Sequence, residues 1–312
     1  MVADSKAQPS IVDLLKSGRT RSAEIIPPRN GAETETIFKQ IEQLKGVPVD
    51  FISVTKGAGG SLRGGTLPIA QMIKTRIDLC SLAHFTCRDY TIEEIENSLM
   101  DHHYFGVHNI LALRGDPPDG QPDHFKPAPN RHSYAWQLVE QIARLNRGEY
   151  IAREGFDKSA AGEPRKGSPT NFCIGVAAHP EHEPLADGVE YLRRKVEVGA
   201  EFAITQMIFS AEPYERFLER CGAAGLRIPV IPGLRIITQA VTAERMMAKF
   251  GVKIPSTLVD RLARAGSKDD ARQIGAEYTY ELSRRLLQAG APGVHVFVMS
   301  DAAAGSQLLT RL

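Results

Sequence analysis

A single carboxylate, Glu24, interrupts the apolar run SAEII at residues 22–26. A carboxyl group in apolar surroundings tends to keep its proton near neutral pH, which makes Glu24 a candidate general acid. The alternative is a structural ion pair with Arg21 or Arg29 at the rim of a strand. Both interpretations are open from the sequence alone.

The run Arg114-Gly115-Asp116 directly follows the apolar stretch HNILAL at 108–113. It combines a fixed cation, a glycine at which a ligand can approach the backbone closely, and an anion. Such a turn could bind a phosphate or an electron-rich ring and place a charge beside it. A structural ion pair between Arg114 and Asp116 is the competing interpretation.

Two histidines, His84 and His179, stand at the ends of apolar runs. They could bind a metal, donate hydrogen bonds to a cofactor or serve a structural purpose. A metal ion would need a third ligand such as Glu24 or Asp116, and the sequence has no HxH or HExxH spacing, so we predict no metal site. The pair His102-His103 lies in an amphipathic helical pattern and is expected at the surface.

Amide and cationic side chains follow in the second half of the chain. Gln206 ends the apolar run EFAITQ, where an amide could read the donor and acceptor edge of a heterocycle. Arg193, Arg194 and Lys195 share one helical segment. They could reach a diphosphate or form a solvated basic face.

Lys56, next to Thr55, raises the alternative of a barrel lyase that forms a Schiff base with a carbonyl substrate. Against this, Gly57-Ala58-Gly59-Gly60 follows directly and indicates a loop. A Schiff-base lysine generally lies within a strand in a dry site. The lyase is kept as an alternative function.

The elements that position these residues repeat as a short apolar run, a polar loop and a longer stretch with helical spacing. Such βα units close most economically into a barrel, and Pro27-Pro28 opposes the Gly-rich turn of a dinucleotide-binding sheet. We therefore predict an α/β fold, a single-domain (βα)8 TIM-type barrel over residues 1–312. Because strand C-termini converge on one bowl of a barrel, the polar residues should meet there. Strands are expected at 22–26, 50–55, 80–85, 108–114, 172–178, 201–207, 228–233 and 294–299.

Three segments lie outside this pattern. The loop 115–133 follows a strand end and should overhang the active face. The segment 152–170 precedes a strand and is predicted to be a surface loop on the opposite face. The N-terminal residues 1–9 are expected to be flexible.

The bulk composition of the 312-residue chain narrows its partners. A formal charge of +1 provides no basic field that would attract nucleic acid. The four cysteines form no CxxC pair, and no apolar run is long enough to cross a membrane. We therefore expect a cytoplasmic protein whose partners are small molecules or sister subunits of a homo-oligomer.

Eight sequence blocks follow one another along the chain: SAEIIPPRN, ISVTKGAGG, AHFTC, LALRGD, SYAWQL, VAAHPE, RRKVEVGAEFAITQMIF and IPVIPGL. In this order and spacing they make the chain resemble the methylenetetrahydrofolate reductase family and specifically its bacterial single-domain members. The resemblance implies a flavoenzyme of one-carbon metabolism and methionine biosynthesis, with FAD across the strand ends of the barrel. Hydride would pass between the flavin and the carbon that bridges N5 and N10, which interconverts 5,10-methylenetetrahydrofolate and 5-methyltetrahydrofolate. The likeness covers about residues 10–300.

The resemblance also implies roles for particular residues. Glu24 matches the general acid that protonates N10, and Asp116 matches a carboxylate whose charge stabilises the N5 iminium. These two residues and Gln206, which matches a pterin-contacting amide, would bind the folate. At His179 relatives often carry a tyrosine. The positions that match flavin contacts are Thr55, His84, Leu113, Arg114, Gly115, Asp116, Tyr134, Ala135, His179, Arg194 and Lys195.

Two stretches depart from the family pattern, both on the substrate side of the flavin. After IPVIPGL, relatives usually continue with a proline and then an aromatic residue, whereas this chain reads Arg235-Ile236-Ile237-Thr238-Gln239-Ala240. After the last strand, Ser300-Asp301 stands where relatives often show Asn-Arg. FAD is therefore expected, with NADH or NADPH as candidate electron donors. A non-catalytic flavin- or folate-binding relative is a further alternative.

Overall fold

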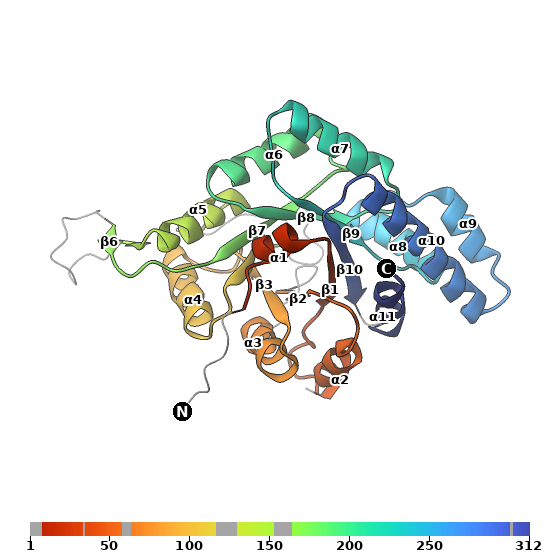
Figure 1. Ribbon diagram of the computed structural model, residues 1–312, viewed down its shortest axis with the longest axis horizontal. Coiled ribbons are helices and arrows are strands. Elements are labelled where there is room, and N and C mark those ends of the chain that lie inside the picture. The colour runs from red at the N-terminus through yellow and green to blue at the C-terminus, as the bar shows by residue number, and fades with distance from the viewer. Residues whose placement is uncertain (1–7, 34, 58–63, 117–129, 153–163, 300–301) are drawn as a thin grey trace.

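Eight parallel strands in the described part of the chain close into a barrel (Figure 1). The computed structural model describes residues 8–33, 35–57, 64–116, 130–152, 164–299 and 302–312. Around the barrel the order is β1-β10-β9-β8-β7-β4-β3-β2, so the last strand pairs with the first. The predicted (βα)8 TIM-type fold is confirmed, with each strand close to its expected place. The strands are β1 (Thr20–Ile25), β2 (Phe51–Val54), β3 (Cys80–Thr86), β4 (Asn109–Leu113), β7 (Cys173–Ala178), β8 (Phe202–Met207), β9 (Val230–Leu234) and β10 (Gly293–Met299).

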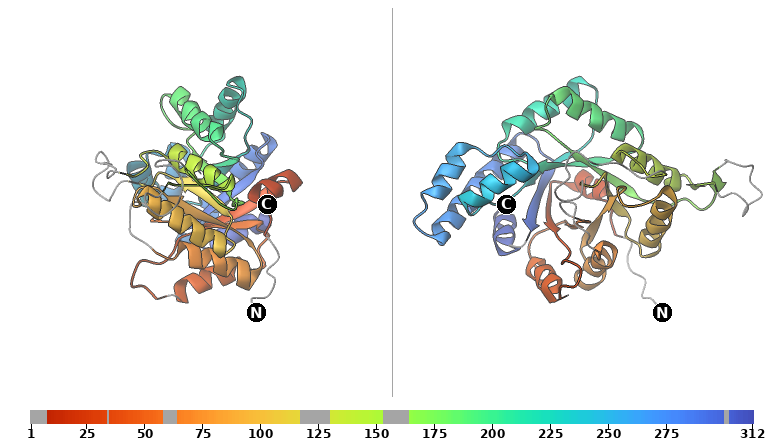
Figure 2. Two further views of the ribbon diagram at one scale, coloured as in Figure 1. Left: turned by 90° about the vertical axis from the view of Figure 1, so that its left-hand side faces the viewer. Right: turned by 180° about the vertical axis from the view of Figure 1, so that it is seen from behind.

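Helices surround the barrel and cover the outer face of its sheet (Figures 1 and 2). Successive residues of a strand point to opposite faces, so Ile25, Ile52 and Val54 point away from the barrel interior. The helices cover these side chains, which are fully buried. The helices are α1 (Ile11–Ser17), α2 (Glu35–Leu44), α3 (Thr66–Ile77), α4 (Ile92–Tyr104), α5 (Ala135–Asn146), α6 (Leu185–Glu197), α7 (Glu212–Ala223), α8 (Ala240–Phe250), α9 (Ser256–Ala263), α10 (Lys268–Gln288) and α11 (Ala302–Arg311).

Helix α4 shows how the helical pattern buries one face. Its apolar stripe contributes Ile95 and Leu99, which are four residues apart, lie on one face and are both fully buried. The expected surface position of His102 is wrong, because this side chain is only 3% exposed. Its Nδ1 lies 2.7 Å from the Ser98 carbonyl oxygen, and its ring packs edge-on against Phe85 at a centroid distance of 5.6 Å. The buried stripe is thus wider than the aliphatic residues indicate.

Apolar side chains fill the half of the barrel interior that lies toward the N-terminal ends of the strands. Inward side chains of several strands, Phe51, Leu82, Phe202 and others, pack together there with Ile11 of α1. The backbone N–H of Ile11 donates to Asn109 Oδ1 over 2.9 Å, at the first residue of β4. Helix α1 therefore plugs the N-terminal end of the barrel, and the strand C-termini form its open end.

Two additions extend the barrel. Between β9 and β10 the chain forms α8, α9 and α10, which share their own apolar cluster and group on one side of the molecule (Figure 2). Between α5 and β7, strands β5 (Glu149–Tyr150) and β6 (Arg165–Lys166) pair antiparallel. The predicted surface loop 152–170 therefore carries a short strand. Residues 153–163 of that loop, 117–129 of the loop 115–133 and 1–7 of the N-terminus lie outside the described residues.

Within the described ranges, every helix is too short or too polar to serve as a membrane span.

Candidate functional site

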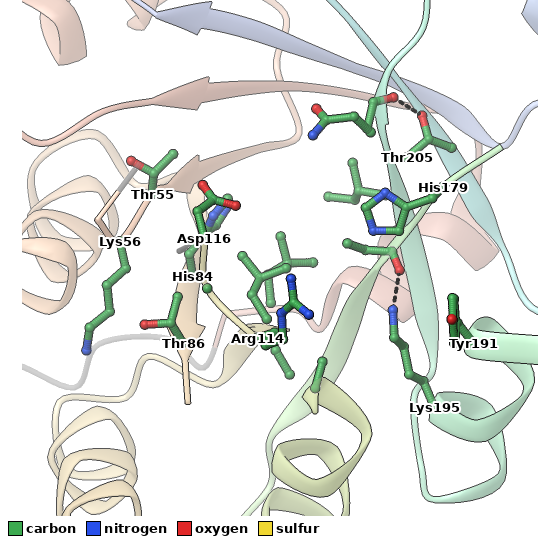
Figure 3. Close-up of a pocket in the computed structure, with 18 of the residues that line it drawn as sticks. Thr55, Lys56, His84, Thr86, Arg114, Asp116, His179, Tyr191, Lys195 and Thr205 are labelled. Atoms are coloured by element: carbon green, nitrogen blue, oxygen red, sulfur yellow. Dashed lines mark hydrogen bonds between the residues drawn. The ribbon is translucent and has the colours of Figure 1, made fainter. Parts of the chain in front are cut away.

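A cavity of about 910 Å³ opens at the strand C-termini (Figure 3). This volume lies at the upper end of the range typical of small-molecule sites. Barrel geometry thus brings the sequence-predicted residues to one place. The wall contains Glu24, Thr55, His84, Leu113, Arg114, Gly115, Asp116, Tyr134, Ala135, His179, Arg194, Lys195 and Gln206.

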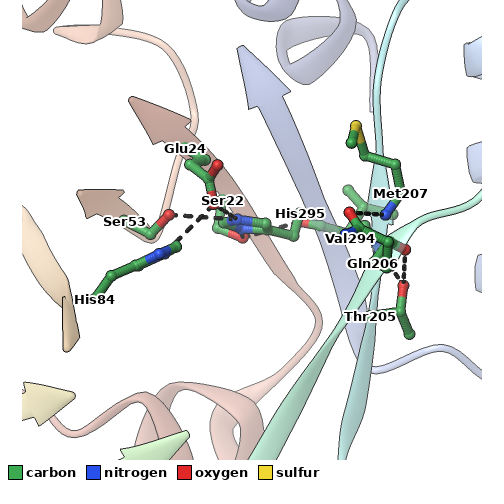
Figure 4. Close-up of polar contacts among 10 residues, drawn as sticks. Ser22, Glu24, Ser53, His84, Thr205, Gln206, Met207, Val294 and His295 are labelled. Carbon is green, nitrogen blue, oxygen red and sulfur yellow. Dashed lines mark hydrogen bonds and ion pairs between the residues drawn. The ribbon is translucent and has the colours of Figure 1, made fainter. Parts of the chain in front are cut away.

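Glu24 projects from β1 into the barrel and is 6% exposed. Its Oε2 lies 3.4 Å from His84 Nε2 on β3 and 3.5 Å from His295 Nε2 on β10 (Figure 4). These histidines, and not Arg21 or Arg29, are its contact partners among the described residues. Glu24 therefore belongs to a layer of polar side chains inside the barrel, which lies between the apolar cluster around Ile11 and the cavity.

His295 connects Glu24 to the serines of the same layer. Its Nδ1 lies 2.8 Å from Ser22 Oγ, and its Nε2 lies 3.4 Å from Ser53 Oγ (Figure 4). Ser22 donates its own hydrogen to the Val294 carbonyl over 3.1 Å, so its oxygen accepts from Nδ1–H. This pattern assigns a proton to Nδ1 and orients the ring so that Nε2 faces the Glu24 carboxyl.

His84 and Thr55 carry unsatisfied polar atoms. Burial lowers the pKa of His84 to about 4, against the opposing charge of Glu24, so the ring is neutral at neutral pH. Among the described residues, neither His84 Nε2 nor Thr55 Oγ1 has a well-formed hydrogen bond, although both are buried. Leaving such an atom without a partner costs about 1–3 kcal/mol. A ligand with polar edges would satisfy both atoms.

Cations line the opposite side of the cavity. Lys195 on α6 is 9% exposed and donates from Nζ to the Ala177 carbonyl over 2.7 Å (Figure 3). Burial, assisted by the charge of Arg114, lowers its pKa to about 8. His179 in the same wall is exposed by contrast. An anion bound here would relieve the repulsion between Lys195 and Arg114.

The three cations predicted on α6 separate on folding. Arg194 is in the cavity wall, where its Nε lies 3.2 Å from Glu190 Oε1. Arg193 also contacts Glu190, over 3.3 Å, but it is not part of the cavity wall and contacts the Ala224 carbonyl over 3.4 Å. One helical turn thus serves both the cavity and the solvated face.

The turn after β4 passes close to the loop after β3. Gly115 has φ +93°, a left-handed conformation that favours glycine. A Cβ atom at this position would lie 3.0 Å from Arg88 Cβ and 3.3 Å from Thr86 Cβ. The sequence therefore needs glycine here for both its backbone angle and its space.

The side of the cavity beside Gln206 is apolar and aromatic. Gln206 Oε1 accepts from the Met207 N–H over 2.9 Å, and Met207, Phe250 and Phe297 line the wall nearby. Phe250 is the last residue of α8, a helix that begins at Ala240, within the stretch that departs from the family pattern. The second departure, Ser300-Asp301, lies outside the described residues.

Arg235 follows β9 and is the charged residue of the first departure. Burial lowers its pKa, and the charge of Glu24 opposes this shift. In the barrel register, His295 pairs with Gly233 and Glu24 pairs with Phe297. Arg235 therefore comes at the level of Glu24, two strands away.

Lys56 lines the cavity, but its ammonium is engaged elsewhere. Nζ donates to Tyr90 Oη over 2.7 Å and lies 4.1 Å and 4.7 Å from the ring centroids of Tyr90 and Phe85. Cation–π contacts of this kind belong to a charged lysine, whereas a Schiff base forms from the neutral amine. The surroundings of Lys56 therefore give the lyase alternative no support.

Sequence reasoning missed several residues that the fold adds to this region. Thr86 and Phe297 line the cavity, and Ser22 and His295 lie beneath it. Ser22 and Thr86 each stand two positions from a predicted site residue on the same strand, so period-two alternation could have identified them. Among the described residues, no group of three or more His, Cys, Asp or Glu side chains could hold a metal ion.

Known proteins resemble the chain over nearly its whole length. The profile of the family described as methylenetetrahydrofolate reductase matches residues 11–312. The 5,10-methylenetetrahydrofolate reductase of Escherichia coli is 31% identical over 288 residues, which cover 90% of this chain and 86% of the relative. Methylenetetrahydrofolate reductase (NADH) 1 of Arabidopsis thaliana is 30% identical over 296 residues and 93% of this chain. The chain spans about half the length of such relatives, 48% in Arabidopsis thaliana and 46% in Schizosaccharomyces pombe.

A solved structure shares the fold at lower sequence identity. An uncharacterized protein from Clostridium thermocellum, which binds two copies of 5-methyl-5,6,7,8-tetrahydrofolic acid, superimposes with a TM-score of 0.60 at 15% identity. The match covers 96% of this chain and 97% of that protein. Together with the family profile and the bacterial relative, the closed barrel leads to one assignment. The chain belongs to the methylenetetrahydrofolate reductase family.

Proposed function

We propose that the protein is an FAD-dependent oxidoreductase that interconverts 5,10-methylenetetrahydrofolate and 5-methyltetrahydrofolate. The observation that carries the proposal is Glu24, a buried carboxyl in the wall of a cavity whose other side is lined by cations, of which Lys195 is buried. A proton donor and an anion site in one cavity are what this reaction needs from its protein. Family membership supports the same conclusion.

The residues of the cavity fit FAD, the cofactor that the family resemblance implies. The unsatisfied atoms Thr55 Oγ1 and His84 Nε2 would meet polar groups of the ligand. Arg114, Arg194 and Lys195 would hold its phosphates and ribityl chain. The bound flavin supplies a two-electron carrier that accepts or delivers a hydride.

Glu24 would hold the proton that opens the five-membered folate ring at N10. His295 Nε2 faces the Glu24 carboxyl, and the hydrogen bond between Nδ1 and Ser22 fixes the orientation of this ring. The imidazole would therefore keep the carboxyl in one place. In the reverse direction the same carboxylate would take the proton back from N10.

Asp116 and Gln206 would act on the pterin from the rim of the cavity. The Asp116 carboxylate stabilises positive charge that develops at N5, because a fixed anion needs no reorganisation during the reaction. The Gln206 amide orients the pterin edge. Phe250 and Phe297 offer apolar surface to the aromatic parts of the substrate.

NADH or NADPH is the proposed electron donor, and the name of the plant relative includes NADH. The test is anaerobic reduction of the FAD-bound protein with NADH, NADPH and 5-methyltetrahydrofolate offered separately. We expect the flavin absorbance to bleach with the folate and with one nicotinamide.

A colourless protein that binds no added FAD would overturn the proposal. Retention of FAD without reaction toward any of the three compounds would identify a non-catalytic relative instead. Glu277, a surface residue paired with Arg311, supplies a control variant, Glu277→Gln, that should react as the unmodified protein does.

A further inference from the structure

The loop between β3 and α4, residues 87–91, lies against the turn Arg114-Gly115-Asp116. The Cys87 N–H donates to the Leu113 carbonyl over 3.2 Å, and Cys87 Sγ lies 3.6 Å from the Arg114 carbonyl oxygen. The missing side chain of Gly115 leaves room for the Cβ atoms of Thr86 and Arg88. The turn is therefore packed against a second loop.

Arg88 extends this contact to Asp116. Its Nη1 donates to the Asp116 backbone carbonyl. On the other side the guanidinium is held by Asp89, through Nε to Oδ1 and Nη2 to Oδ2, both over 2.8 Å. Arg131 in turn donates to the Arg88 carbonyl over 2.8 Å. The Arg88 side chain is only 10% exposed, so its guanidinium has a fixed orientation.

The base of this loop is also fixed. At the start of α4, the Glu94 N–H donates to Thr91 Oγ1 over 3.3 Å and the Thr91 N–H donates to Glu94 Oε2 over 2.7 Å. Such a capping box typically contributes about 1 kcal/mol to helix stability. Arg88 is thus anchored through α4 to the body of the barrel.

We infer that Arg88 is a positioning residue for the proposed reaction, which sets the place of the Asp116 carboxylate by holding the backbone carbonyl of the same residue. The inference rests on the proposed function, in which this carboxylate stabilises developing charge. A displacement of about 1 Å at such a group can cost on the order of 10²-fold in rate. Lysine cannot replace Arg88, because a single ammonium lacks the planar fork that binds Asp89 and the carbonyl together.

The experiment compares Arg88→Ala and Arg88→Lys with Arg311→Ala. Arg311 makes a similar two-point contact with Glu277 at the surface, over 2.7 and 3.2 Å. Arg311→Ala therefore shows what the loss of a paired arginine does to the protein away from the cavity. Two readouts are taken from the FAD-bound proteins: the rate of flavin reduction at saturating 5-methyltetrahydrofolate and the midpoint potential of the flavin.

We expect Arg88→Ala to lower the rate by about 10- to 100-fold and to move the midpoint potential toward that of Asp116→Asn. Arg311→Ala should change neither. In the Asp116→Asn background, Arg88→Ala should have no further effect, since a residue that acts through a partner is silent once the partner is gone. If Arg88→Ala does not fold, Arg88→Lys takes its place in the comparison, because it keeps the charge and loses the planar fork.

Equal behaviour of the Arg88 variants and Arg311→Ala in a wild-type protein that reacts with folate would overturn this inference alone. Additive effects of Arg88→Ala and Asp116→Asn would overturn it as well. A wild-type protein that binds no FAD would instead overturn the proposed function, and this inference with it.

Discussion

His84 Nε2 lies 3.4 Å from Glu24 Oε2, yet the two residues form no ion pair at neutral pH. Burial lowers the pKa of His84 to about 4, so a neutral ring faces the carboxyl. His295 Nε2 lies 3.5 Å from the same oxygen. The candidate acid therefore lies between two imidazoles, and the His84 ring does not neutralise its charge.

Glu24→Gln keeps the shape of this side chain and removes the titratable proton. We expect flavin reduction by 5-methyltetrahydrofolate to slow by roughly 10²- to 10⁴-fold, the usual contribution of general acid–base catalysis. Reduction by the nicotinamide should be nearly unchanged. Anaerobic stopped-flow absorbance separates the two half-reactions, and an unaltered folate half-reaction would remove Glu24 from its proposed role.

His295→Leu tests how much the polar layer around Glu24 contributes to the folding stability of the protein. The imidazole is fully buried between Ser22 and Ser53, and its loss leaves both hydroxyls without that partner. We expect the free energy of unfolding in urea to fall by about 1–3 kcal/mol. Adding Ser22→Ala should cost less in this variant than in the wild type, because the shared hydrogen bond is already lost. Equal costs would show that the two residues are uncoupled.

Lys195 predicts a pH dependence of FAD binding. Its pKa is lowered to about 8, so the ammonium loses its charge as the pH rises through that value. The affinity of the apoprotein for FAD should be constant below about pH 7 and should weaken above about pH 8. Fluorescence quenching on binding measures this. Lys195→Arg, whose guanidinium stays charged, should remove the dependence, and persistence of the same pH profile in that variant would contradict the assignment.

Gly115→Ala and Gly225→Ala form a matched pair. Both positions have positive φ, +93° and +73°, so alanine should cost about 1–2 kcal/mol of folding stability at each. A Cβ at Gly225 meets nothing within 4 Å, whereas one at Gly115 meets Arg88 and Thr86. Titration with FAD should show weaker binding for Gly115→Ala alone. Equal affinities in both variants would mean that the turn tolerates displacement.

Much of the fold could be predicted because its signals are local. Each strand is a short apolar run, and the polar residue at its end reaches the bowl through barrel geometry, as Glu24 and Gln206 do. His102 was misplaced because helical spacing shows where an apolar stripe runs and not how wide it is. Phe250 was missed because its position depends on how α8 packs after β9, a contact between segments with no local signature.

Helix α1 is synthesised before every element that it contacts. The N–H of Ile11 finds its acceptor on Asn109, 98 residues further along the chain, and its side chain belongs to an apolar cluster with residues of strands from β2 to β9. Its binding surface exists only after those strands have assembled, and contacts this distant in sequence form late. Amide exchange at Ile11 should therefore report completed assembly, because α1 docks only after the strands that follow it in the chain have come together.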